Sequence, residues 1–225
     1  GWTLPGHRAE QLVTTHDRLI ACVHEHEAAG AIGVFGHARG KAGLAKQGRL
    51  LVSLGLLVQL KVEDRFTVGD LATGLPGTIK VEAIVLGPSW VKADHVELYA
   101  NGLLLRDADI EDANRPGEKA RMVWHLPKPK HDVHLVAIAT GPGVVEPFWE
   151  IPRPYQASSK TFIPRVMGST NPIWLDADGN GRFQSAHEYA RSLLAKLGGD
   201  PRKLQEALLQ YDQAVAVQVA SLAVK

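Results

Sequence analysis

The chain has 225 residues, of which 45% are hydrophobic and 22% are charged, and its formal net charge is +1. A chain of this size can bury a substantial core in one large or two small domains, and its near-neutral charge does not favour nucleic acid or an anionic membrane as a partner. The single cysteine, Cys22, excludes an internal disulfide framework. No apolar run reaches the roughly 18 residues of a membrane-spanning helix, and no signal peptide opens the sequence. Because the sequence begins without Met, we expect a fragment of a longer protein.

The first segment, residues 1–48, is predicted to be a helix followed by a linker. Apolar residues recur at helical spacing between His16 and Ala29, and Gly30 then provides a stop. The connection from Gly36 to Gly48 is rich in glycine, lysine and arginine. It suits either a solvated linker or a site for a phosphate or carboxylate group.

The middle of the chain, residues 49–170, is predicted to be an Ig-like β-sandwich. Its strands are expected where apolar residues alternate with polar ones, a pattern seen at Ile79–Val85, Val96–Ala100, Met122–Leu126 and Val133–Thr140. Asn101-Gly102 supplies the positive-φ pair of a type I′ hairpin turn. Several short strands at this spacing are typical of a sandwich. The overall fold class is therefore mainly β with flanking α.

A proline-rich excursion follows the strands, from Gly141 to Pro164. Its prolines exclude helix and central strand, so we expect it to wrap over the sandwich. Phe148, Trp149 and Tyr155 lie within it. These aromatic side chains either attach the loop to its own core or stack on a sugar ring.

The last segment, residues 171–225, opens with an acidic loop that resembles a calcium site. An EF-hand loop takes oxygen ligands from positions 1, 3, 5, 7 (a backbone carbonyl), 9 and 12, with Gly at 6. Counted from Asp176, the matching residues are Asp178, Asn180, Gly181, Arg182 and Gln184. Position 12 is His187, a poor ligand for a hard ion, so we expect Glu188 to close the site. The metal ligands predicted for Ca²⁺ are therefore Asp176, Asp178, Asn180, Arg182 and Glu188.

The same loop has an explanation that needs no ion. Asp176 and Asp178 are also suited to Asx-turns and to capping the helix that follows.

A C-terminal helix pair is predicted after the acidic loop. Tyr189, Leu193 and Leu197 indicate the first helix, which Gly198-Gly199 ends, and Asp200-Pro201 begins the second. The second helix carries one apolar stripe, formed by Leu204, Leu208, Tyr211, Val215, Val219 and Leu222. Such a stripe packs against a core or forms a subunit contact, so homo-oligomerisation through this helix is one expectation.

Two histidine motifs suggest transition-metal ligands. His24-Glu25-His26 has H-x-H spacing, and in His131-Asp132-Val133-His134 a strand would place Asp132 and His134 on one face. Solvated or singly hydrogen-bonded histidines are the alternative. The sequence contains no G-x-S-x-G motif, Walker loop or dinucleotide fingerprint.

Four runs of residues occur in the same order as in a known family. They are Gly48–Gly55, Val96–Gly102, Ala137–Gly143 and Asn171–Gly181. Together they resemble the C-terminal part of the CehA/McbA-type PHP metallohydrolases, which are relatives of carbaryl hydrolase. The catalytic metal centre of that family lies in an N-terminal PHP barrel, whose motifs are missing from this sequence.

The resemblance implies a non-catalytic accessory domain of a PHP-type metal-dependent hydrolase, which would act with the missing catalytic domain in cis. Calcium in the acidic loop would stiffen it. Two alternatives remain open at this point. One is a carbohydrate- or surface-binding sandwich that uses Trp149 or Tyr155, and the other is a small metal-dependent hydrolase that uses His131, Asp132 and His134.

Overall fold

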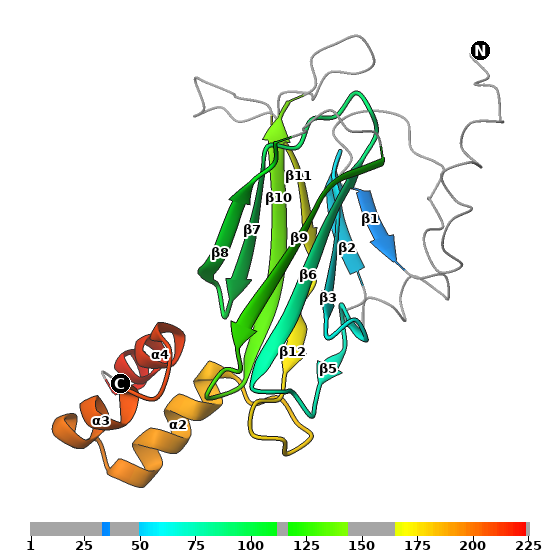
Figure 1. Ribbon diagram of the computed structural model, residues 1–225. Coiled ribbons are helices and arrows are strands. Elements are labelled where there is room, and N and C mark those ends of the chain that lie inside the picture. The colour runs from blue at the N-terminus through cyan, green and yellow to red at the C-terminus, as the bar shows by residue number, and fades with distance from the viewer. Residues whose placement is uncertain (1–32, 37–49, 112–116, 144–164, 224–225) are drawn as a thin grey trace, which may run out of the picture.

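A computed structural model describes residues 33–36, 50–111, 117–143 and 165–223 (Figure 1). The predicted helix at residues 16–29, the linker at 37–48 and residues 144–164 of the proline-rich excursion lie outside these ranges. So do the motif His24-Glu25-His26 and the aromatic residues Trp149 and Tyr155.

The described part of the chain is mainly β with flanking helices, and its strands form two sheets. The smaller sheet has the order β4 (Phe66–Thr67), β3 (Leu57–Val62), β6 (Thr78–Gly87) and β9 (Gly117–Pro127). The larger sheet has the order β1 (Gly33–Gly36), β2 (Leu50–Leu54), β11 (Arg165–Thr170), β10 (Val133–Pro142), β12 (Ile173–Leu175) and β5 (Leu71–Ala72). In the same sheet, β7 (His95–Ala100) pairs with β10, and β8 (Leu103–Asp109) pairs with β7.

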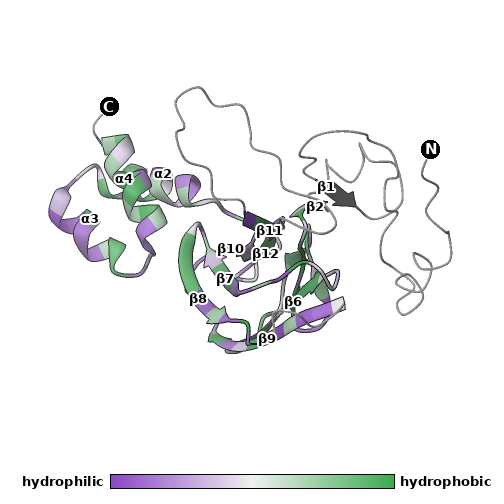
Figure 2. Ribbon diagram, turned by 90° about the horizontal axis from the view of Figure 1, so that it is seen from above, coloured by the Kyte–Doolittle hydropathy of each residue, from purple (hydrophilic) through white to green (hydrophobic). Residues whose placement is uncertain are grey.

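One hydrophobic core joins the two sheets. Because side chains alternate along a strand, every second residue points into it. Val58, Leu60 and Val62 contribute from β3, while Leu135 and Ala137 contribute from β10, and all five are almost fully buried. Seen from above in Figure 2, the strands curl around this shared interior.

The predicted hairpin at Asn101-Gly102 is confirmed. Asn101 and Gly102 have φ values of 50° and 81°, and they connect β7 to β8 in antiparallel pairing. A bulge between Leu98 and Tyr99 shifts the register within β7. The strands expected at residues 79–85, 122–126 and 133–140 also lie within β6, β9 and β10.

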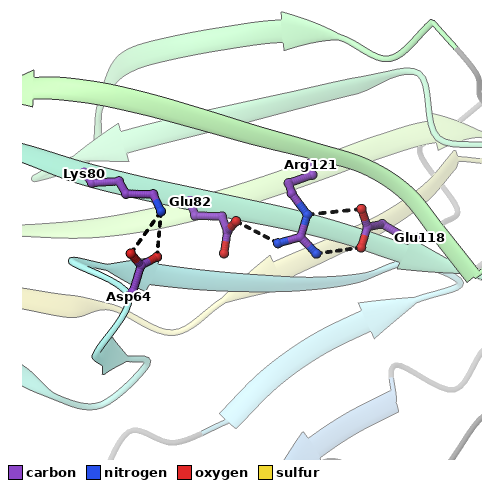
Figure 3. A network of polar contacts seen from close by, with 5 residues as sticks. All are labelled: Asp64, Lys80, Glu82, Glu118 and Arg121. Carbon is purple, nitrogen blue, oxygen red and sulfur yellow. Dashed lines mark hydrogen bonds and ion pairs between the residues drawn. The ribbon is translucent and has the colours of Figure 1, made fainter. Parts of the chain in front are cut away.

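The outer face of the smaller sheet carries two separate groups of ion pairs (Figure 3). Arg121 of β9 lies 2.7 Å from Glu82 of β6 and also 2.7 Å from Glu118. The hydrogen bonds to Glu118 and Glu82 raise the pKa of Arg121, and its guanidinium charge compensates the negative charge of the buried Glu82. Lys80 pairs with Asp64 at 2.8 Å. Exposed ion pairs contribute little to stability. The main effect of these contacts is that charged side chains on neighbouring strands are hydrogen-bonded to one another.

Three helices form a small unit at the end of the sheets where β7 turns into β8 (Figure 1). They are α2 (Ala186–Leu197), α3 (Pro201–Leu208) and α4 (Gln213–Ala223). Ala190, Leu193, Leu204, Val215 and Val219 form their common core. The expected ends are confirmed, because Gly198 caps α2 in the left-handed conformation and Asp200 caps α3. None of the helices described is long and apolar enough to cross a membrane.

The prediction of a helix pair is wrong, because the second predicted helix is divided in two. Its first part is α3, which ends at Leu208, and its second part is α4, which begins at Gln213. Asp212, directly before α4, accepts a hydrogen bond from Val215 N–H. Asp212 also accepts a hydrogen bond from Asn101 at 2.9 Å. The apolar stripe continues across the break, so its periodicity did not reveal the turn.

Replacement of Gly168 by Ala tests the close contact between the sheets. The added Cβ would lie 2.5 Å from the carbonyl oxygen of Leu56, so the backbone must move. We expect Gly168→Ala to lower the free energy of unfolding by roughly 1 to 3 kcal/mol in urea titrations. Gly77→Ala is the matched control, because a Cβ there meets no atom within 4 Å. Equal stability of the two variants would contradict this account of the packing.

Candidate metal site

The acidic loop meets the start of β10 because of strand register. β10 pairs with β12 so that Val133 lies opposite Leu175. Asp132 comes directly before Val133, and Asp176 comes directly after Leu175. Antiparallel pairing therefore places these two aspartates side by side, although they are far apart in the sequence.

Three carboxylates converge at this point. Oxygen atoms of Asp132, Asp176 and Asp178 all lie within 4.8 Å of one another, a separation at which they can share one ion. Asp132 is 0% exposed and Asp176 is 1% exposed, whereas Asp178 lies at the surface. The site thus has two buried ligands at its base and one ligand on the solvent side.

Hydrogen bonds from the loop backbone hold Asp176 in place. Its Oδ1 accepts from the N–H groups of Gly179 and Asn180 at 2.7 and 3.1 Å, and its Oδ2 accepts from Gly181 N–H at 2.8 Å. Gly179 and Gly181 have φ values of 77° and 78°, which permit this tight turn. Burial by itself raises the pKa of Asp176, but these N–H donors hold it below its ordinary value. The turn therefore favours the ionised form of this carboxylate.

Asp132 ties the two ends of the loop to the sheet. Its Oδ1 accepts from Ala177 N–H and its Oδ2 accepts from Gln184 N–H, both at 2.8 Å. The sequence motif suggested Asp132 as a metal ligand together with His131 and His134, not with the acidic loop. The position of Asp132 beside the loop depends on the pairing of β10 with β12, and no local sequence motif indicates that pairing.

Among the residues that the structure describes, no basic side chain balances the charge of the three carboxylates. Within the described ranges, neither lysine nor arginine forms an ion pair with Asp132, Asp176 or Asp178. Grouping like charges at low exposure is unfavourable unless a proton or a cation compensates. Asp176 Oδ1 already accepts two hydrogen bonds, but the other carboxylate oxygens accept one each and keep a lone pair, so a cation can be held without breaking the turn.

Glu188 does not close the loop as expected. Its carboxylate accepts from the N–H and the hydroxyl of Ser185, at 2.7 and 2.8 Å, and forms the capping box of α2. These bonds lower the pKa of Glu188. Asp132, not the expected Glu188, is the carboxylate that lies against the loop.

The other predicted ligands lie at the solvent side. Asn180 donates from its side chain to Asp178 at 2.8 Å and accepts from Arg182 N–H at 2.8 Å. The expected Asx-turn is present at Asp178, which accepts from Asn180 N–H, whereas Asp176 accepts from N–H groups three to five residues further on. The expected helix cap is not formed by these aspartates, because Ser185 caps α2.

The structure does not bring His131, Asp132 and His134 together as a ligand set. His131 is buried between the rings of Tyr189 and Tyr211, and its Nε2 lies 3.4 Å from Asp212 Oδ2. The His134 ring faces Phe183, and burial lowers its pKa. Only Asp132 of the three contributes to the carboxylate group.

No family model, curated protein or solved structure matches this chain.

The pH dependence of stability tests the contact between the sheets and the helical unit. Burial acts to raise the pKa of Asp212, but the His131 ring, the Asn101 amide and Val215 N–H together lower it to about 2. A depressed pKa stabilises the fold above the unfolded value of about 3.9, and this contribution is lost as the pH falls toward 2. We expect Asp212→Asn to lower the free energy of unfolding by roughly 1 to 2 kcal/mol at neutral pH.

Asn is also a good helix cap that can still accept from Val215 N–H, so this variant keeps the cap and removes the charge together with the acceptor that faces Asn101. The difference between the wild type and the variant should shrink between about pH 4 and pH 2 in urea titrations followed by circular dichroism. A difference that stays constant over this range would show that the charge of Asp212 makes no contribution.

Proposed function

We propose that this chain is a non-catalytic accessory module of a PHP-type metal-dependent hydrolase, and that its acidic loop binds calcium. In this proposal the two sheets form the Ig-like sandwich, and the missing PHP domain supplies the catalytic centre in cis. The module supports the catalytic domain or shapes its substrate entrance. The support for a PHP-type parent is the ordered resemblance in sequence.

The observation that carries the ion-binding part is the carboxylate group of Asp132, Asp176 and Asp178. Two of its members are buried, and it lacks a basic partner among the described residues. All three donors are oxygen, which suits a hard cation such as calcium better than a transition metal. Calcium takes six to eight oxygen ligands, so water and other loop oxygens would complete the site.

Ion binding at this position would stiffen the attachment of the helical unit. The loop connects β12 directly to α2, and Asp132 anchors it at Ala177 and Gln184. Asp132 N–H also donates to the hydroxyl of Tyr189 in α2. A cation shared by the three carboxylates would hold the end of the sheet, the loop and the first turns of α2 together.

Calcium titration of the full chain tests the ion-binding part of the proposal. We expect saturable heat in calorimetry and a higher melting temperature with calcium than with chelator. A ligand that binds only the folded state at 100 times its dissociation constant stabilises that state by about 2.7 kcal/mol. Asp178→Asn should abolish the shift, since this side chain is exposed and its loss leaves the buried hydrogen bonds intact.

Glu188→Gln is the control, and it should bind calcium as the wild type does. Loss of binding in Glu188→Gln with retention in Asp178→Asn would reverse the ligand assignment. A wild-type chain with neither heat nor a melting shift would reduce the loop to a hydrogen-bonded turn. The non-catalytic part has its own test, because hydrolysis of esters or carbamates by the purified chain with a retained metal would refute it.

A further inference from the structure

A second group of metal-ligating side chains lies on the outer face of the β7–β8 hairpin, away from the acidic loop. His95 pairs directly with Asp109, and Glu97 pairs directly with Asp107. Val96 and Leu98 are buried, so the alternating side chains of His95 and Glu97 point to the opposite face of β7. Directly paired residues of antiparallel strands share a face, which brings one imidazole and three carboxylates together.

The position of Asp109 determines which imidazole nitrogen is available. Nδ1 of His95 lies 2.8 Å from Asp109 Oδ1, so the Nδ1 proton is held by this carboxylate. Nε2 lies 3.9 Å from Glu97 Oε1 and 3.8 Å from Asp107 Oδ2, both too long for hydrogen bonds. The other oxygen of Glu97 accepts from the hydroxyl of Tyr99 at 2.9 Å. Nε2 therefore faces two carboxylates, one of which is already oriented.

The charge of this group is negative in either protonation state of His95. Three carboxylates surround a single imidazole, and no lysine or arginine in the described part of the chain pairs with them. The nearest basic residue along β8, Arg106, donates instead to the carbonyl oxygen of Leu105. A divalent cation would neutralise most of this charge, and the nitrogen donor distinguishes this site from the all-oxygen loop.

We propose that His95 Nε2, Glu97 and Asp107 bind a divalent transition ion of the zinc class. Bonds from zinc to nitrogen and oxygen are about 2.0 to 2.2 Å, so neighbouring ligands on a tetrahedral ion are roughly 3.5 Å apart. The two observed separations are only slightly longer. Asp109 behind the imidazole is the carboxylate–histidine arrangement that orients metal ligands, and Tyr99 orients Glu97 in the same way.

Closing three ligands on one ion requires the Asp107 side chain to turn. Among the described residues, three donor atoms already lie within 4.8 Å of one another only at Asp132, Asp176 and Asp178. Asp107 already lies 3.8 Å from Nε2, so it is the distance between the Asp107 and Glu97 carboxylates that must shorten, and the Asp107 side chain, 58% exposed, has room to rotate toward Glu97. Glu97 and His95 are less exposed, at 27% and 29%, and form the fixed side of the site.

The experiment is a titration of the full chain with zinc chloride in excess calcium, followed residue by residue through backbone amide NMR shifts. Calcium keeps the all-oxygen loop from contributing. We expect saturable shifts at residues 95–109 in the wild type, and their loss in His95→Gln. His125→Gln is the matched control, because His125 is an exposed histidine on β9 of the other sheet. In this variant, zinc should shift the amide signals of residues 95–109 as it does in the wild type.

Two further variants keep the test decisive if His95→Gln disturbs the hairpin. Asp107→Asn leaves the His95–Asp109 contact intact and should abolish the saturable shifts. Asp109→Ala should weaken zinc binding about tenfold, as expected for loss of a carboxylate behind a ligating imidazole. The proposal is overturned if residues 95–109 show no saturable response to zinc, or if His95→Gln and Asp107→Asn both respond as the wild type does.

Discussion

The antiparallel pairing of β10 with β12 is the constraint on which the rest of the candidate metal site depends. This pairing sets Val133 opposite Leu175 and so brings Asp132 beside Asp176. A shift of one residue would turn the side chains of β12 to the other face, removing Ile173 and Leu175 from the core. Burial of these side chains therefore fixes the register, and the register assembles the carboxylates. Stability of the core and formation of the site have the same physical origin.

The helical unit is attached to the sheets by a few polar contacts around Asp212. Asn101 at the tip of the β7–β8 hairpin donates to Asp212, and its side-chain oxygen accepts from His134 N–H. Asp212 also caps α4 by accepting from Val215 N–H. The same carboxylate therefore stabilises the start of α4 and contacts the β7–β8 hairpin through Asn101. The acidic loop forms a second attachment through Asp132 and Tyr189. Two attachment points restrict rotation of the helices against the sheets more than either contact does separately.

Both proposed ion sites arise where strands place like charges together and no basic partner is found in the described ranges of the chain. They differ in the donors that they offer. The loop supplies only oxygen and suits a hard cation, whereas the hairpin supplies one imidazole, whose Nδ1 contacts Asp109. They also differ in depth, because two carboxylates of the loop are buried and the hairpin group is partly exposed. The two sites can therefore be distinguished by the ions that occupy them.

The sequence by itself determined the features that depend on neighbouring residues. Asn101-Gly102 specified a hairpin because both positions need positive φ, and Gly198 and Asp200 marked helix ends because they satisfy local backbone groups. The turn around Asp176 was also predictable, since its donors lie within five residues. Only the tertiary structure decided that Asp132 joins this loop, that Asp212 divides the C-terminal helix and that His95 faces three carboxylates. Each of these depends on strand pairing or on contacts between distant segments, and the periodicity of apolar residues is the same whether or not such contacts form.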